Sequence, residues 1–401
     1  MDFDTLKKLR FENESKVVLF ILDGLGGLPA GPDAVTELEA AKTPNLDRMA
    51  SEGICGLHQA IGPGITPGSG PAHLGVFGYD PLKYQVGRGV LSALGVNFEL
   101  RAGDIAARGN FCTIDEEGLI TDRRAGRIPT ETNEALCAKL RSVKVSGAEV
   151  FVETVKEHRL LVVFRGDGLS HDLKDTDPQA VGVAPLDPVA TSKAAEKSVG
   201  VVKEFLSKAR EVLADSSPAN MMTLRGFAEK PDLPLFGETY GVRAGAIASY
   251  PMYRGVAKLV GMEVLETGLE VPDEFTTIEK RWNEFDFFFI HVKKTDSTGE
   301  NGDFDGKVQV IEMVDELLPR ILDLGPSAMV VTGDHSTPSL MRSHSWHPVP
   351  TLLWGQNVRP DGVKEFGERA CLAGALGVRL PAIDLMPIAM AHAGRLEKFG
   401  A

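Results

Sequence analysis

Three apolar runs that each lead into a carboxylate constrain the fold more than any other feature of this chain. The runs VVLFIL, FDFFFIHVKKTD and SAMVVTGDH lead, in this order, to Asp23, Asp296 and Asp334. Continuous runs rich in Val, Ile, Leu and Phe are typical of strands buried on both faces of a parallel sheet. Ligands of open α/β sheets bind at the carboxyl ends of the strands, so we expect the three carboxylates to lie at one edge.

Histidines accompany these carboxylates. His335 follows Asp334 directly, and His344 and His347 precede the next predicted strand, PTLLWG. Adjacent carboxylate and imidazole groups at a buried strand end need a compensating partner. We therefore interpret Asp334, His335 and His344 together as metal ligands rather than as ordinary surface or core residues. His291, inside the second run, fits either the core or a position behind the ligands.

The segment ITPGSGPAHLGVFGYDP places Ser69 between two glycines and before Pro71, which suits the first turn of a helix. A serine at a helix N-terminus lies near amide donors and the positive end of the dipole, which favours an attacked anion. Ser69 could instead simply cap the helix. Because the glycines clear space for a substrate, we predict a nucleophile. Position 67 is Pro, so the G-x-S-x-G motif of α/β-hydrolases is absent.

The middle of the chain has a different pattern. Short strand-like pieces surround one helical piece between residues 101 and 177, without carboxylate-terminated core strands, which indicates an α+β insert. We therefore expect a three-layer α/β/α catalytic domain built from residues 1–100 and 190–401. A smaller substrate-binding domain is expected at 101–189.

Charge narrows the choice of partners. The 401 residues carry 43 Lys and Arg against 56 Asp and Glu, a formal net charge of -13, which disfavours nucleic acid or an anionic membrane as partner. Eight arginines lie between residues 101 and 165, and a local basic cluster in an acidic chain predicts a small, doubly anionic substrate. No apolar stretch approaches the ~20 residues of a membrane span. Four cysteines without CxxC spacing indicate a reducing, cytoplasmic setting.

In order along nearly the whole chain, the sequence resembles the archaeal-type cofactor-independent phosphoglycerate mutases, a branch of the alkaline-phosphatase-like metalloenzyme superfamily. The motifs that carry this resemblance are LDGLGG, AKTPNLD, ITPGSGPAHLGVFGYDP, ARGNF, DRRAGRI, EHR, TDP, KKTD, TGDHSTP and HSWHPVP. The resemblance implies an alkaline-phosphatase-like α/β domain with an inserted substrate-binding domain. It also implies two divalent metal ions beside a transiently phosphorylated serine. Manganese is the expected metal, with magnesium, cobalt or zinc as alternatives, and no 2,3-bisphosphoglycerate is required.

Carried over motif by motif, the resemblance implies two ligand sets. Ser69 is the expected phosphoryl acceptor and also a ligand. The first metal would be held by Asp23, Ser69, Asp334 and His335, and the second by Asp296 and His344.

One departure from the family pattern affects the second metal. The family reads D-x-x-G-H after the KKT element, whereas this chain has Glu300 in place of that histidine. We expect Glu300 to bind the metal instead, because Gly299 permits a tight bend toward Asp296. Alternatively Glu300 faces solvent, and the second site is either empty or completed by Asp303 or His347.

The implied function is the interconversion of 3-phosphoglycerate and 2-phosphoglycerate in glycolysis and gluconeogenesis, through a phosphoserine. The alternatives are a metal-dependent phosphohydrolase, a mutase for a related small phosphoester, and a non-catalytic sensor. The residues expected to bind the anionic substrate are Arg123, Arg124, Arg127, His158, Arg159, Arg108 and Arg254.

Overall fold

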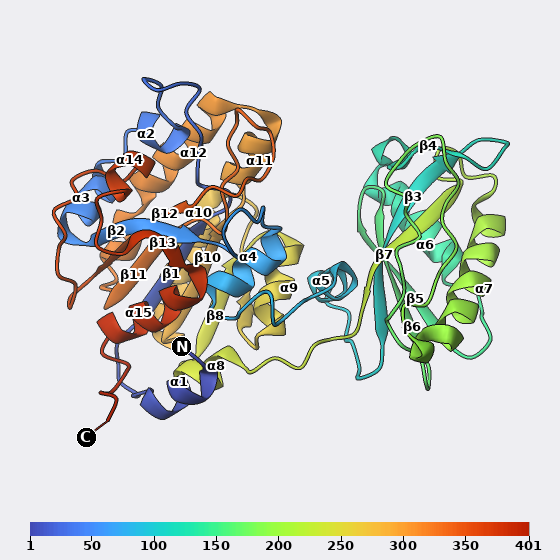
Figure 1. The fold of residues 1–401 in the computed structure, drawn as a ribbon, viewed down its shortest axis with the longest axis horizontal. Helices are drawn as coiled ribbons and strands as arrows, with labels where there is room; N and C mark the ends of the chain where they lie inside the picture. Colours follow the sequence, from blue (N-terminus) through green and yellow to red (C-terminus); the bar gives the residue numbers. More distant parts are fainter. Residues whose placement is uncertain (401) are drawn as a thin grey trace. The chain divides into compact units, whose positions relative to one another are not determined.

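The computed structural model describes residues 1–400, which form two compact units. Unit 1 comprises Met1–Gln85 and the chain from Leu233 onward, and unit 2 comprises Val86–Asp232. Unit 2 is continuous in sequence and interrupts unit 1, as expected for an insert. The predicted fold class, a layered α/β domain with a smaller α+β insert, is confirmed (Figure 1).

Unit 1 is built on an eight-stranded sheet in which the three predicted runs are central neighbours. Strand β1 pairs in parallel with β10 and β11, whereas β12 is antiparallel to both of its neighbours. The strand order is β13 (Gly377–Pro381), β2 (Ile54–Gln59), β12 (Val349–Gly355), β11 (Ala328–Thr332), β1 (Val17–Leu22), β10 (Phe287–Val292), β8 (Ala244–Ala248) and β9 (Glu263–Leu265).

Helices cover both faces of this sheet (Figure 1). They are α1 (Phe3–Leu9), α2 (Glu37–Ala40), α3 (Pro44–Glu52), α4 (Ser69–Val76), α8 (Phe236–Tyr240), α9 (Pro251–Leu259), α10 (Val271–Arg281), α11 (Lys294–Asn301), α12 (Phe304–Leu317), α13 (Pro319–Leu322), α14 (Glu368–Cys371) and α15 (Leu385–His392), with 3₁₀ turns η3 (Trp282–Glu284) and η4 (Ala382–Asp384).

Strand β10 shows why the apolar runs are continuous. Phe288 and Ile290 belong to a core that also contains apolar side chains of α3, α10 and α12. Phe287 and Phe289 point the other way and contact Phe236 of α8 and Phe77, the residue that follows α4. Side chains alternate between the faces of a strand, so burial on both faces requires apolar residues at every position.

Unit 2 is an antiparallel sheet with helices packed on it. Its strands are β3 (Ile105–Ile114), which pairs with β4 (Ile120–Asp122), β6 (Arg159–Arg165) and β7 (Met221–Ala228), and β5 (Glu149–Lys156), which pairs with β6. Its helices are α5 (Arg88–Gly95), α6 (Thr130–Leu140) and α7 (Glu196–Leu213), with 3₁₀ turns η1 (Ala125–Arg127) and η2 (Lys193–Ala195).

The expected insert boundaries, 101–189, are wrong because the segments on both sides belong to unit 2. Helix α7 buries Val202 and Phe205 in the core of unit 2, and β7 adds a strand beside β3. Helix α5 also lies within this unit. The amphipathic pattern of α7 predicts that it is a helix with one buried face, but it does not specify which core that face joins.

Phe205→Ala tests these boundaries. Phe205 packs edge-on against Phe164 of β6, with ring centroids 5.5 Å apart, and is fully buried. Removing such a ring should destabilise unit 2 by about 3–5 kcal/mol. Hydrogen exchange should accelerate in β3 and β6 and stay unchanged in β1 and β10. Phe275→Ala, in the core of unit 1, is the matched control and should give the opposite pattern. Equal loosening of both units by Phe205→Ala would contradict the boundaries.

Candidate functional site

The three carboxylates that end the apolar runs meet at one edge of the unit 1 sheet. Asp23 directly follows β1, Asp334 follows β11 by two residues, and Asp296 lies in the first turn of α11 after β10. Because β11, β1 and β10 are adjacent and parallel, their carboxyl ends coincide. All three carboxylates are buried.

One group of possible ligands surrounds Nε2 of His335. Asp334 Oδ2 lies 3.2 Å and Asp23 Oδ1 lies 3.4 Å from this nitrogen, and neither oxygen has a hydrogen-bond partner among the described residues. Ser69 Oγ, at the start of α4, lies 3.3 Å from the same nitrogen. The structure thus brings together the four residues expected at the first metal.

The hydrogen bonds of His335 make this group suitable for a cation. Thr337 Oγ1 donates to Asp296 Oδ1 at 2.7 Å and accepts from Nδ1 of His335 at 3.0 Å. With the proton on Nδ1, the lone pair of Nε2 faces two carboxylate oxygens, and a bound cation relieves the repulsion. Burial lowers the pKa of His335, which favours the neutral ring that metals require.

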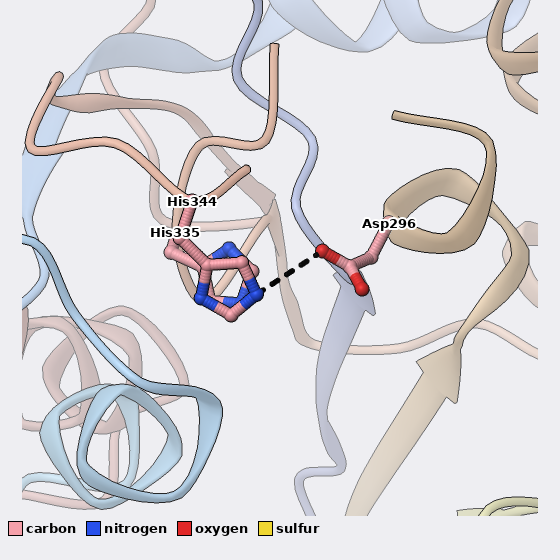
Figure 2. Close-up of side chains that lie close together, drawn as sticks. All are labelled: Asp296, His335 and His344. Atoms are coloured by element: carbon pink, nitrogen blue, oxygen red, sulfur yellow. Dashed lines mark ion pairs between the residues drawn. The ribbon is translucent and has the colours of Figure 1, made fainter. Parts of the chain in front are cut away.

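A second group consists of Asp296, His335 and His344, whose ligand atoms lie within 4.8 Å of one another. Figure 2 shows the imidazole of His344 stacked on that of His335, with centroids 3.7 Å apart, and a carboxylate oxygen of Asp296 facing them. His344 Nδ1 donates to the carbonyl of Pro67 at 2.9 Å, so its Nε2 points at Asp296 Oδ1, 3.5 Å away. Carboxylate and imidazole donors of this kind fit manganese, zinc or cobalt.

Glu300 lies at the margin of the second group. Its Oε1 is 3.8 Å from His344 Nε2, and its side chain is 55% exposed. Asp303 instead caps α12 by accepting from the amide of Gly306, and His347 Nδ1 contacts Ser345 Oγ. The structure therefore engages both alternative ligands elsewhere, while the role of Glu300 remains a prediction.

Sequence reasoning missed Lys293, whose ammonium lies between Asp23 of the first ligand group and Asp296 of the second. Its Nζ donates to Asp23 Oδ2 at 3.1 Å and to Asp296 Oδ2. Burial alone would lower the pKa of Lys293, but the two carboxylates outweigh it and raise the pKa. In return, the pKa of Asp23 lies well below its ordinary value although burial opposes this. The KKTD motif shows that a lysine is near, but not which way it points.

Two buried histidines lie behind the carboxylates. His291 Nε2 is 3.2 Å from Asp23 Oδ2, and its ring stacks on Tyr253 at a centroid distance of 3.7 Å. His73 Nδ1 lies 3.2 Å from Asp334 Oδ2 and donates to the carbonyl of Ser69 at 2.8 Å. His291 therefore lies behind a carboxylate that we predict to bind metal, in agreement with the second of its two expected positions. Sequence reasoning missed His73.

The glycines of LDGLGG allow the loops after β1 and β11 to touch. A Cβ on Gly26 would lie 1.9 Å from Ser336 Oγ, and one on Gly24 would lie 2.5 Å from Thr337 Oγ1. Gly24 also has φ +65°, which side chains rarely adopt. These glycines are therefore what lets Asp23 approach Asp334.

Unit 2 contains a second charged site, formed by arginines around two aspartates. Arg123 makes a two-pronged contact to Asp177, at 2.9 and 3.2 Å, and Arg225 lies 3.4 Å from the same residue. Arg225 Nε is buried and lies 3.6 Å from Asp175 Oδ2, an ion pair too long to be a hydrogen bond. Burial and the nearby Arg225 lower the pKa of Arg88. Arg88, Arg123 and Arg225 thus lie around Asp175 and Asp177, and guanidinium groups are the side chains that bind phosphate or carboxylate in two-pronged contacts.

The predicted substrate residues are distributed around this site. Arg108 of β3 lies directly opposite Arg225 of β7 in the sheet. Burial and the cations Arg159, Arg124 and Arg127 lower the pKa of His158 to about 4. Arg254 differs: it lies in unit 1, on α9, and pairs with Glu266 at 2.8 Å.

Arg88 and Arg225 were missed. Their motifs, GRGVLSALG and LRGFA, carry no signal beyond a glycine next to an arginine. Only the pairing of β7 with β3 places Arg225 beside Arg108.

Among residues 1–400, no helix combines the length and apolar character needed to cross a bilayer.

Two solved structures show the same fold. A protein of Pyrococcus horikoshii matches with a TM-score of 0.83 and 31% identity, covering 98% of this chain and 100% of its own. The cofactor-independent phosphoglycerate mutase of Thermoplasma acidophilum matches with a TM-score of 0.72 and 30% identity, covering 95% and 100%. The fold therefore places this chain in one structural class with that enzyme, and its two groups of carboxylates and histidines could each hold a metal ion.

Sequence relatives specify the family within that class. The probable 2,3-bisphosphoglycerate-independent phosphoglycerate mutase of Thermus thermophilus is 50% identical over 404 residues, covering 100% of this chain and 99% of its own. The Aquifex aeolicus protein of the same description is 48% identical over 409 residues, covering 99% and 100%. The family model of that description matches residues 50–220. The chain belongs to the 2,3-bisphosphoglycerate-independent phosphoglycerate mutase family.

Proposed function

We propose that this protein interconverts 3-phosphoglycerate and 2-phosphoglycerate, with Ser69 as the transient phosphoryl acceptor. The observation that carries the proposal is the position of Ser69 Oγ, 3.3 Å from His335 Nε2, the same nitrogen that faces two carboxylate oxygens without hydrogen-bond partners among the described residues. Family membership supports the same activity. The activity implies a role in glycolysis and gluconeogenesis, and with it a cytoplasmic location, as parts of this proposal.

The chemistry assigned to Ser69 is reversible phosphoryl transfer. Its oxygen forms a bond to phosphorus, the bond from phosphorus to the glycerate oxygen breaks, and that oxygen takes a proton. After glycerate reorients, its other hydroxyl bonds to phosphorus and gives up its proton, the bond from phosphorus to Ser69 Oγ breaks, and Oγ takes up a proton to restore the serine. The amide groups at the start of α4 favour the negative charge of the phosphoryl group. Divalent cations, when bound, would lower the pKa of the serine hydroxyl and neutralise phosphoryl oxygens.

We assign one cation to Asp23, Asp334, His335 and Ser69, and the other to Asp296, His344 and Glu300. Three aspartates and a glutamate make this set rich in hard oxygen donors, which favours manganese or magnesium over zinc. The close contact between His335 and His344 supports two neighbouring cations, because each ring directs Nε2 toward a different carboxylate.

The arginine cluster of unit 2 is assigned to the carboxylate and phosphate of the substrate. Arg225 supports this assignment because its ion pairs with Asp175 and Asp177, at 3.6 and 3.4 Å, leave its buried Nε without a hydrogen-bond partner within the described chain. Arg123 is already engaged with Asp177 and acts as a brace for the others. We assign direct anion contacts to Arg88, Arg108, Arg159 and Arg225.

An assay with 3-phosphoglycerate tests both the activity and the nucleophile. The wild-type protein with Mn²⁺ should form 2-phosphoglycerate without matching release of phosphate, whereas phosphate as the main product would assign a hydrolase. Ser69→Ala should fold normally and lose about 10³-fold or more in turnover, because it lacks the covalent nucleophile. Ser51→Ala, on α3, is the control and should be as active as wild type. More than a tenth of wild-type activity in Ser69→Ala would exclude the assignment.

Glu300→Gln tests the substituted ligand. Glu300 follows Asp296 by four residues on α11, so both side chains lie on one face of that helix. The variant should bind one of the two Mn²⁺ ions at least about tenfold more weakly, since an amide oxygen is a poorer ligand than a carboxylate. Isothermal titration calorimetry gives both affinities. Glu316→Gln, an exposed change on α12, is the matched control. Two unaltered affinities in Glu300→Gln would show that Glu300 only borders the site.

A further inference from the structure

Lys307 is a fully buried lysine on α12 that none of the functional assignments uses. Its Nζ donates to three backbone carbonyls, those of Gly24 at 2.9 Å, Gly26 at 3.2 Å and Thr337 at 2.9 Å. A lysine ammonium has three N–H donors, and here each has an acceptor. The exposed fraction of the residue is 0%. The ammonium of Lys307 therefore has no contact with water, and three hydrogen bonds from its single nitrogen replace that hydration.

Those carbonyls belong to two loops that both carry cation ligands. Gly24 and Gly26 lie in the loop after β1, which begins with Asp23, and Thr337 lies in the loop after β11, which carries Asp334 and His335. The loops also contact each other directly, because the amide of Thr337 donates to the carbonyl of Gly26 at 3.0 Å. Without the ammonium group, the carbonyls of Gly24 and Gly26 would share the amide of Thr337, and the carbonyl of Thr337 would lose its donor among the described residues.

Two carboxylates, of the buried Glu37 and the half-buried Glu368, bind the outer ends of the same loops. Glu368 of α14 accepts from the amide of Gly27 at 2.7 Å, and Glu37 of α2 accepts from the amide of Ser339 at 2.7 Å. Burial lowers the pKa of Lys307, while these two carboxylates act in the opposite direction. Lys307, Glu368 and Glu37, from three helices, thus bind backbone atoms of both loops. None of these backbone atoms is a predicted metal ligand.

We propose that Lys307 is a positioning residue: a fixed internal cation that sets the spacing between the β1 and β11 loops and so preorganises Asp23, Asp334 and His335 for a divalent cation. This inference rests on the metal centre of the proposed function. In its absence the divalent cation itself would have to order the two loops, and the cost of that ordering would weaken its binding. A lysine fits this role because its three donors radiate from a single atom, whereas the planar fork of arginine does not.

Lys307→Met tests the proposal because methionine has a similar length and no donors. We expect calorimetry to show that Mn²⁺ binds at least about tenfold more weakly at one of its two sites, while the other affinity changes less. Circular dichroism and thermal unfolding in EDTA report how far the fold itself is affected.

Asp315→Asn is the matched control on the same helix. Asp315 is also buried, and its carboxylate accepts from the amides of Leu46 at 2.7 Å and Asn45 at 3.2 Å, at the start of α3, which carries no ligand. This variant should lower the melting temperature and leave both Mn²⁺ affinities as in wild type.

Wild-type affinities in Lys307→Met, or equal weakening in both variants, would overturn the positioning role and leave Lys307 as part of the general core. If Lys307→Met does not fold, Lys307→Gln, which keeps an N–H donor at shorter reach, is measured against the same two expectations. A wild-type protein that binds no divalent cation would overturn the metal centre of the proposed function instead. The two failures are therefore distinguishable.

Discussion

Negative charge buried at the carboxyl edge of the unit 1 sheet is the constraint on which the rest of the site depends. Asp23, Asp296 and Asp334 are nearly or fully excluded from water, and two of their oxygens have no hydrogen-bond partner in the described chain. An isolated buried carboxylate is strongly destabilised unless a positive group compensates it. The surrounding residues therefore have to supply, or to bind, positive charge.

In our account the buried negative charge is balanced by two kinds of cation, the lysine ammonium groups of the protein and exchangeable divalent ions. Lys293 touches two of the carboxylates directly, whereas Lys307 holds the backbone of the loops that carry them. His335 faces two carboxylate oxygens with an unprotonated nitrogen, so it cannot neutralise them itself. In our account divalent cations balance this remaining negative charge, and the same cations activate Ser69 as the proposed nucleophile.

Much of this arrangement could be predicted from the sequence because it follows from local rules. Strands buried on both faces must be continuously apolar, and their common direction brings Asp23, Asp296 and Asp334 to one edge. Ser69 could be found from its glycine neighbours and Pro71. The likeness of the motifs to one family supplied the ligand sets, and membership of that family is confirmed by the relatives.

The rest depends on tertiary contacts that no local pattern encodes. Lys307 occupies a helix position where a lysine is usually exposed, and only the meeting of two loops makes it a buried donor. Arg225 joins the arginine cluster of unit 2 because β7 pairs with β3. This pairing brings Arg225 beside Arg108, more than one hundred positions away in the sequence. The same pairing moves the boundaries of unit 2 beyond the α+β pattern visible in the sequence.

Anomalous diffraction at the manganese edge, from crystals grown with Mn²⁺, tests the central claim most directly. The account predicts two anomalous peaks per chain at the edge of the unit 1 sheet. One should be ligated by Asp23, Ser69, Asp334 and His335, and the other by Asp296 and His344. Absence of peaks at these residues, with Mn²⁺ bound elsewhere or not at all, would contradict the account.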